Sequence, residues 1–139
     1  MGSTVVIILF ATLLVATGVL MLWWMGQTGG RQLNVERYRS QWLEIEGSLS
    51  QKQPASYQMA ILNADKLLDR ALRERGYRGN TMGERLKTAG SAFGNINAVW
   101  AAHKLRNRIA HETDVNITYT TARRALATFK QALKDLGAI

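Results

Sequence analysis

The first part of the chain is dominated by apolar residues. Positions 4–25 read TVVIILFATLLVATGVLMLWWM, and residues 1–30 contain no charged side chain and no histidine. At about 1.5 Å per residue, a helix of this length crosses the roughly 30 Å hydrocarbon core of a bilayer. Trp23 and Trp24 end the run, where indole rings favour the membrane interface. We therefore expect one transmembrane helix in the lipid bilayer, Thr4–Met25, followed by a glycine-containing exit that ends at residue 30.

A cleaved signal peptide is the alternative reading of this segment. The apolar run is long, no positively charged region precedes it, and no small-x-small cleavage site follows it, so a retained anchor is favoured. Arg31, Arg37 and Arg39 come directly after the run. Because cytoplasmic flanks carry an excess of Lys and Arg, this asymmetry predicts a single-pass protein with its N-terminus outside and its C-terminal domain in the cytoplasm.

Residues 31–139 show a helical pattern of apolar and polar positions instead. Apolar residues recur at intervals of three and four, which is typical of helices that bury one face. Four long segments have this pattern: 35–49, 54–75, 95–112 and 118–136. A shorter one runs from Thr81 to about Ala92.

Several residues mark the expected helix ends. The sequence TMGE, Thr81 to Glu84, matches a capping box, in which the hydroxyl and the carboxylate accept hydrogen bonds from free backbone N–H groups. Thr118 is a candidate N-cap for the last helix. Gly76 and Gly137 follow apolar stripes and are expected to end their helices.

The segment 54–75 is the clearest helix of the set. Its apolar stripe predicts a core-facing side, and its charged residues are expected on the opposite, solvent-facing side: Asp65, Lys66, Asp69, Arg70, Arg73, Glu74 and Arg75. No alternating strand pattern occurs anywhere in the chain. The sequence therefore predicts an all-α fold, with an anchor in residues 1–30 and a four- to five-helix bundle in residues 31–139.

Charge fits two kinds of partner. The net charge is +8, and all charged residues lie in positions 31–139, which fits a polyanion such as RNA. Attraction to the anionic cytoplasmic leaflet, worth about 1 kcal/mol per basic residue, explains the charge equally well. The chain has no cysteine, which excludes disulfides and thiolate metal sites. The aromatic residues Tyr57, Trp100, Tyr119 and Phe129 fall on apolar stripes, and we interpret them as core rather than as base-stacking platforms.

The segment 95–112, NINAVWAAHKLRNRIAHE, carries the candidate chemistry. At about 100° per residue, one face of this helix combines apolar and polar side chains: Ile96, Val99, Trp100, His103, Asn107, Ala110 and His111. Arg106 lies at the edge of this face. Because burying an unpaired polar group costs about 1–3 kcal/mol, the face either lines a cleft or interface or has its polar groups satisfied by neighbours.

Arg106 and His111 could support RNA cleavage by attack of a ribose 2′-OH on the adjacent phosphate. Histidine supplies a proton acceptor with an ordinary pKa near 6.5, and the planar arginine fork matches phosphate oxygens. The two residues are five positions apart, which is about 140° around a helix. One helix therefore cannot aim both at one phosphorus atom, unless the helix frays before His111 or two copies of the motif face each other in a dimer.

The run RNRIAH, Arg106–His111, resembles the Arg–polar–x–x–x–His motif of the HEPN superfamily, and AHKLRNRIAHE is similar to small bacterial membrane-anchored proteins. The similarity covers about residues 55–136. It implies a helical bundle that commonly forms homodimers with the motifs juxtaposed. Many members are metal-independent ribonucleases that need no cofactor, and others are inactive binding or scaffold domains. Arg106 and His111 would be the catalytic pair, beside the candidate substrate-binding residues His103, Lys104, Asn107 and Arg108.

Structural roles compete with catalysis at each of these positions. Arg106 could pair with an acidic side chain, Asn107 could fix helix register, and His111 could interact with the helix C-terminus. A metal site of His103, His111 and Glu112 is disfavoured because the two histidines are eight positions apart. The rival functions are an inactive interaction or scaffold subunit of a membrane-associated assembly and an electrostatic sensor of anionic lipid.

Overall fold

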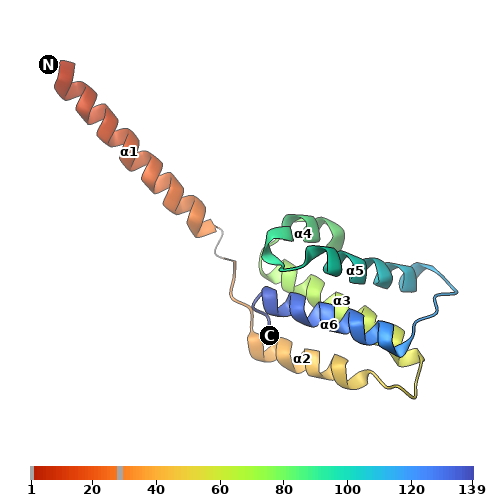
Figure 1. Ribbon diagram of the computed structural model, residues 1–139. Helices are drawn as coiled ribbons and strands as arrows, with labels where there is room; N and C mark the ends of the chain where they lie inside the picture. The colour runs from red at the N-terminus through yellow and green to blue at the C-terminus, as the bar shows by residue number, and fades with distance from the viewer. Residues whose placement is uncertain (1, 28–29) are drawn as a thin grey trace. The chain divides into compact units, whose positions relative to one another are not determined.

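The computed structural model describes the backbone of residues 2–27 and 30–139 and the side chains of residues 2–22 and 30–139. All regular secondary structure in these ranges is helical, so the predicted all-α class is confirmed. The elements are α1 (Gly2–Gln27), α2 (Val35–Ser48), α3 (Ala55–Glu74), α4 (Met82–Thr88), a 3₁₀ helix (Gly90–Ala92), α5 (Ile96–His111) and α6 (Tyr119–Asp135) (Figure 1). Contacts within the chain divide it into two compact units, Met1–Gly30 and Arg31–Ile139.

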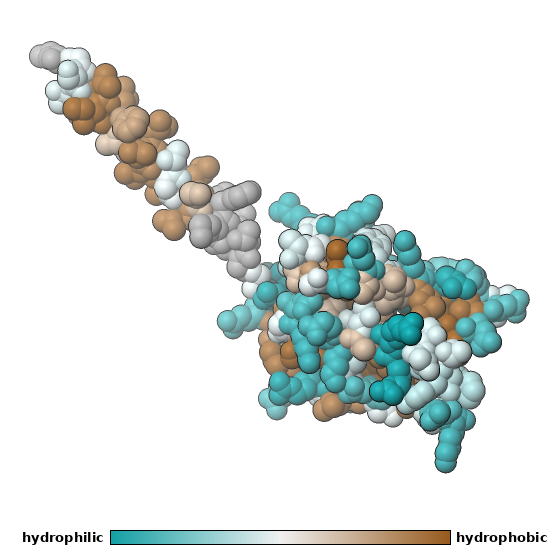
Figure 2. All heavy atoms as spheres, in the orientation of Figure 1, coloured by the Kyte–Doolittle hydropathy of each residue, from teal (hydrophilic) through white to brown (hydrophobic). Residues whose placement is uncertain are grey.

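The first unit is an apolar helix with the length and composition of a membrane span. Gly2–Leu22 has a mean hydropathy of 2.8 and no buried residue. Brown hydrophobic side chains dominate the described part of α1 in Figure 2, whereas teal hydrophilic ones cover much of the visible face of the second unit. Thr12 and Thr17 donate their hydroxyl hydrogens to carbonyl oxygens of the preceding turn, which satisfies these groups in an apolar environment. The expected interfacial positions of Trp23 and Trp24 lie outside the described side chains.

The second unit is a helical bundle organised around α3. This helix packs against α2, α4, α5 and α6, whereas the short α4 packs mainly on α3. The largest fully buried side chains come from several of these helices and include Tyr38, Trp42, Ile61, Leu86 and Phe129. Because α3 has neighbours on several sides, more of its circumference is buried than one apolar stripe would cover.

Two helices begin at the N-cap residues that the sequence predicts. Thr118 Oγ1 accepts a hydrogen bond from the N–H of Thr121 at 3.1 Å, as predicted for an N-cap. Thr81 Oγ1 likewise accepts from the N–H of Glu84 at 3.2 Å. The reciprocal bond differs from the prediction, because the Glu84 carboxylate accepts from the N–H of Asn80, one residue before the cap.

Two glycines end their helices with a left-handed residue. Gly76 has a φ of 91° and Gly137 a φ of 70°. In both cases the next residue donates its N–H to a carbonyl five positions back, and the glycine donates to one three positions back, which is the Schellman arrangement. The predicted helix stops at both glycines are therefore confirmed.

Alanine substitution at Gly76 and at Gly47 is expected to change stability in opposite directions. No heavy atom lies within 4 Å of a Cβ added at either position, so only backbone preference differs. Gly76→Ala should lower the free energy of unfolding by about 1–2 kcal/mol because of its positive φ. Gly47→Ala, within α2, should raise it by about 0.5 kcal/mol. Urea unfolding of the 31–139 domain measures both, and the same sign for both would contradict this explanation.

Tyr38 of α2 makes the domain sensitive to alkaline pH. Burial raises the pKa of its hydroxyl well above the ordinary range, and the Glu74 carboxylate raises it further. The folded state therefore holds the neutral phenol while the unfolded chain ionises above about pH 10. This contribution to stability is fully present below pH 10 and is lost as the pH rises further. At pH 11 the loss should be about 1.4 kcal/mol, and it should be absent from Tyr38→Phe. The free energies of unfolding of the wild type and of Tyr38→Phe are measured between pH 8 and pH 11. If this explanation is wrong, the two values will change in parallel with pH.

Candidate functional site

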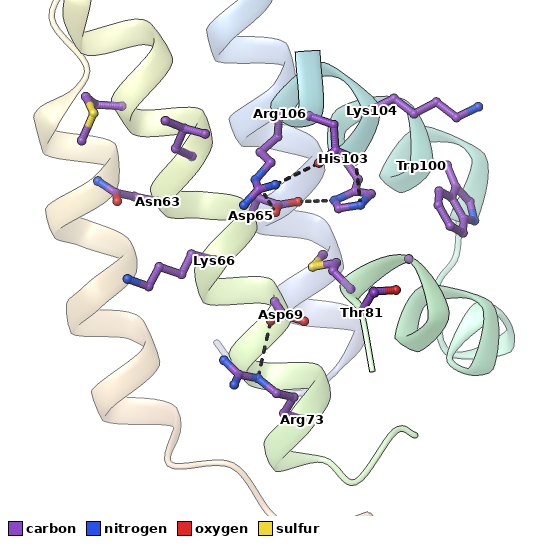
Figure 3. Close-up of a pocket in the computed structure, with 15 residues that line it drawn as sticks. Asn63, Asp65, Lys66, Asp69, Arg73, Thr81, Trp100, His103, Lys104 and Arg106 are labelled. Atoms are coloured by element: carbon purple, nitrogen blue, oxygen red, sulfur yellow. Dashed lines mark hydrogen bonds and ion pairs between the residues drawn. The ribbon is translucent and has the colours of Figure 1, made fainter. Parts of the chain in front are cut away.

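A groove of about 1,040 Å³ lies between α3, α4 and α5. Its α3 side carries Asp65, Lys66, Asp69 and Arg73, and its α5 side carries Trp100, His103, Lys104, Arg106 and Asn107 (Figure 3). Four of the six site residues expected from the sequence therefore line one hollow. Arg108 and His111 do not line it.

Asp65 is the residue that holds the α5 side chains in place. Its side chain is buried, with 2% of the residue exposed. The Oδ1 atom lies 2.8 Å from His103 Nδ1, and Oδ2 forms an ion pair with Arg106 Nε at 3.2 Å. The contact at Arg106 Nε does not have the geometry of a hydrogen bond, so the attraction there is ionic. Asp65 thus fixes two neighbouring turns of α5 to the middle of α3.

Asn107 closes this arrangement into a ring. Its Nδ2 lies 3.2 Å from His103 Nε2, and its Oδ1 accepts a hydrogen bond from Arg106 Nη1 at 2.9 Å. The Asp65 carboxylate can only accept a hydrogen bond, so His103 Nδ1 must donate to it. Asn107 already accepts through Oδ1, so its Nδ2 is the donor toward His103 Nε2. This pattern assigns a neutral His103 with its hydrogen on Nδ1. Both ring nitrogens of His103 are then engaged, so His103 offers no free nitrogen to a ligand, whereas Asn107 keeps a second Nδ2 hydrogen at the groove.

The position of Asp65 corrects the sequence prediction, which put this residue on the solvent-facing side of its helix. It is buried because α5 covers that side of α3. A signal was present in the sequence, because Asp65 is four positions after Ile61 and three before Leu68, in phase with the core. An acidic residue in phase with an apolar stripe indicates a buried cationic or histidine partner on another helix.

A second buried ion pair secures α4. Arg85 Nε lies 2.7 Å from Asp69 Oδ1, and Arg85 also donates from Nη1 to the carbonyl oxygen of Gly79. Arg73 pairs with the other oxygen of Asp69 at 3.5 Å. Arg85 is buried, so it holds α4 to α3 and is not one of the surface cations that could meet a polyanion. Both carboxylates that line the groove are therefore neutralised by arginines.

His111, unlike the buried His103, is exposed to solvent. Helix α5 continues to His111 without fraying, and the histidine is exposed in the last turn. No hydrogen bond or ion pair of its side chain occurs within residues 30–139, and it does not contact Arg106 in the same chain. It lies four positions after Asn107, so it continues the groove-facing side of α5 beyond the groove.

Three further residues of α5 lie in surroundings that differ from the sequence prediction. Arg108 is exposed and pairs with Glu112 at 3.4 Å, away from the groove. Ala110, expected on the apolar face, is exposed near the helix end. Trp100, interpreted as core, packs against the core as expected, but it is also partly exposed and lines the groove.

The disfavoured metal site has no structural counterpart. In the described part of the chain, no three His, Asp or Glu side chains lie close enough to hold a metal ion. His103 is buried in the ring with Asp65, whereas His111 and Glu112 are exposed at the end of α5.

The fold and groove define a class: an all-α chain with one apolar helix of membrane-spanning length and a helical bundle that carries a polar, arginine-containing groove. Comparison of the chain with models of protein families, with curated proteins and with solved structures gives no match.

Proposed function

We propose that this chain is a membrane-anchored, HEPN-like domain that cleaves RNA without a metal ion, with Arg106 and His111 as its catalytic pair. The observation that carries the proposal is the state of Arg106. Asp65 and Asn107 hold the guanidinium on one side, yet 34% of its side chain is exposed at the groove. An arginine in this state can meet the oxygens of a phosphodiester bidentately.

His111 supplies the proton acceptor in this proposal. The ribose 2′-oxygen bonds to phosphorus as its proton passes to His111, the bond from phosphorus to the 5′-oxygen breaks, and that oxygen takes a proton from water. Because Arg106 and His111 do not meet within one chain, the site forms between two copies, with Arg106 from one and His111 from the other. Cross-chain pairing removes the angular conflict of about 140° on a single helix.

The anchor and its orientation belong to the same proposal. Arg31, Arg37 and Arg39 are exposed directly after the apolar helix. Because cytoplasmic flanks carry an excess of Lys and Arg, these residues support a single-pass protein with an outer N-terminus and a bundle in the cytoplasm, where RNA is found.

The test is RNA cleavage by the full chain in detergent and by the 31–139 domain, both in EDTA. The domain has its own core, which extends from Leu33 to Ala138. His111→Ala provides the comparison, and Arg124→Ala, an exposed arginine of α6, controls for general loss of positive charge. Cleavage that is absent from the wild type, or equal in His111→Ala, would reject the proposal.

An inactive interaction or scaffold subunit of a membrane-associated assembly is the second candidate function. A specific observation favours it: the ring of Asp65, His103, Asn107 and Arg106 is complete within one chain, as in a purely structural network. This candidate predicts that neither Arg106→Ala nor His111→Ala changes the handling of RNA.

A further inference from the structure

Trp100 divides two hollows on the surface of the bundle. On one side it lines the groove of about 1,040 Å³, and on the other it lines a second hollow of about 500 Å³ with Asn97, Ala101 and Lys104. Lys104, one helical turn later, also lines both. An aromatic ring and a cation therefore line both hollows, and Figure 3 shows the two side chains on α5.

The indole of Trp100 is held in a defined orientation. Its ring lies edge-on to the imidazole of His103, with the centroids 6.0 Å apart and the planes at 69°. Atoms of its six-membered ring lie 3.5 and 3.8 Å from the point where Gly83 would carry a Cβ. The ring therefore lies against His103 of α5 and beside Gly83 of α4, while part of the residue remains exposed.

The charges around Trp100 favour an anionic ligand. The two carboxylates of the groove, Asp65 and Asp69, are already paired with arginines. The exposed ammonium groups of Lys66 and Lys104 have no ion pair in residues 30–139, and Lys104 points away from Asp65 in Figure 3. The order along α5 is thus an aromatic ring, a free cation and the held guanidinium of Arg106.

We infer that Trp100 is a base-stacking platform, so that the groove selects single-stranded RNA. An unstacked base packs on the indole while Lys104 contacts an adjacent phosphate, and the strand continues toward Arg106. Aromatic stacking accepts any base but requires it to be unpaired, so duplex RNA is excluded from this contact. The inference rests on the proposed function for the choice of RNA, and it names a specificity residue beyond the Arg106–His111 pair.

The experiment measures binding of uncleavable strands to the full chain in nanodiscs of neutral lipid. The probes are a single strand of about 12 nucleotides with 2′-O-methyl riboses, its abasic equivalent, and a duplex of the same length. Trp100→Leu should weaken binding of the single strand about tenfold, and Trp100→Phe should retain it. The abasic strand should bind wild type and Trp100→Leu equally. Thermal unfolding confirms that each variant is folded.

Two matched lysine variants separate phosphate contact from general charge. Lys104→Gln should weaken both the single strand and the abasic strand, whereas Lys52→Gln, in the exposed loop before α3, should change neither. Unchanged binding in Trp100→Leu, or an equal loss for the abasic strand, would overturn the inference. Displacement of the strand by anionic phospholipid vesicles with the same dependence on Trp100 would assign the groove to a lipid headgroup and also overturn it.

These measurements can reject the proposed RNA cleavage and the proposed base stacking on Trp100 independently of each other. The 2′-O-methyl strand lacks the attacking hydroxyl, so its binding does not depend on catalysis. Trp100-dependent binding without cleavage of ordinary RNA would reject only the nuclease. Cleavage that persists in Trp100→Leu with unchanged affinity would reject only the stacking platform.

Discussion

Asp65→Ala is expected to lower the free energy of unfolding of the 31–139 domain by about 3 kcal/mol. The substitution removes the shared partner of His103 and Arg106, and it leaves a buried imidazole N–H without an acceptor. The loss should lie at the lower end of the range for broken buried pairs, because Arg106 is partly exposed and can turn toward water. Urea unfolding followed by circular dichroism measures the change.

Two other variants test the origin of this loss. Glu46→Ala removes an exposed carboxylate that pairs with Lys130 at 3.0 Å, and its effect should stay within about 1 kcal/mol. Asp65→Asn keeps an acceptor for His103 but loses the charge that attracts Arg106, so it should cost about half as much as Asp65→Ala. Equal effects of Asp65→Ala and Glu46→Ala would show that the buried ring contributes little to stability.

Inactive variants of Arg106 and His111 are expected to restore each other in mixed dimers. Each variant alone should lose cleavage of single-stranded RNA by about 100-fold or more, as expected for loss of a general base or of a group that stabilises the transition state. A dimer of one Arg106→Ala chain and one His111→Ala chain keeps one intact composite site. Such dimers should recover about half of the wild-type activity, since one of two symmetric sites is complete.

Co-expression of the two full-length variants with different affinity tags isolates the mixed dimers. Sequential purification on both tags removes dimers of either single variant, and the rate is then measured in EDTA. A double variant, Arg106→Ala with His111→Ala, paired with wild type keeps no composite site, because each site lacks one of its two groups. Activity of this control equal to that of the mixed variants would contradict the cross-chain arrangement.

The sequence predicts the helices better than it predicts the site. The apolar periodicity, Thr118 and the two terminal glycines depend on residues close together in the chain, and these local features are confirmed. The burial of Asp65 and Arg85 depends on which helices pack together, which single-helix periodicity does not contain. Periodicity alone therefore predicts a charged side of 54–75 that faces solvent as a whole, although α5 and α4 cover part of it.

The candidate site shows the same division between local and tertiary information. Spacing on one helix correctly puts Trp100, His103 and Asn107 on a common face, and it correctly indicates that Arg106 and His111 diverge. It does not reveal that Asp65 engages His103 and Arg106, since that residue is 38 positions away from His103 along the chain. Nor does it reveal that Trp100 stays partly exposed at the groove, which depends on how the helices pack around it.

The ring around Arg106 also has an entropic consequence. A long, flexible side chain normally loses up to about 2 kcal/mol of rotamer freedom when it is immobilised. In this fold Asp65 and Asn107 restrict the Arg106 rotamers before any ligand arrives. Much of the entropic cost of fixing Arg106 is therefore already included in the free energy of folding of the bundle. An incoming phosphate then meets a preorganised donor.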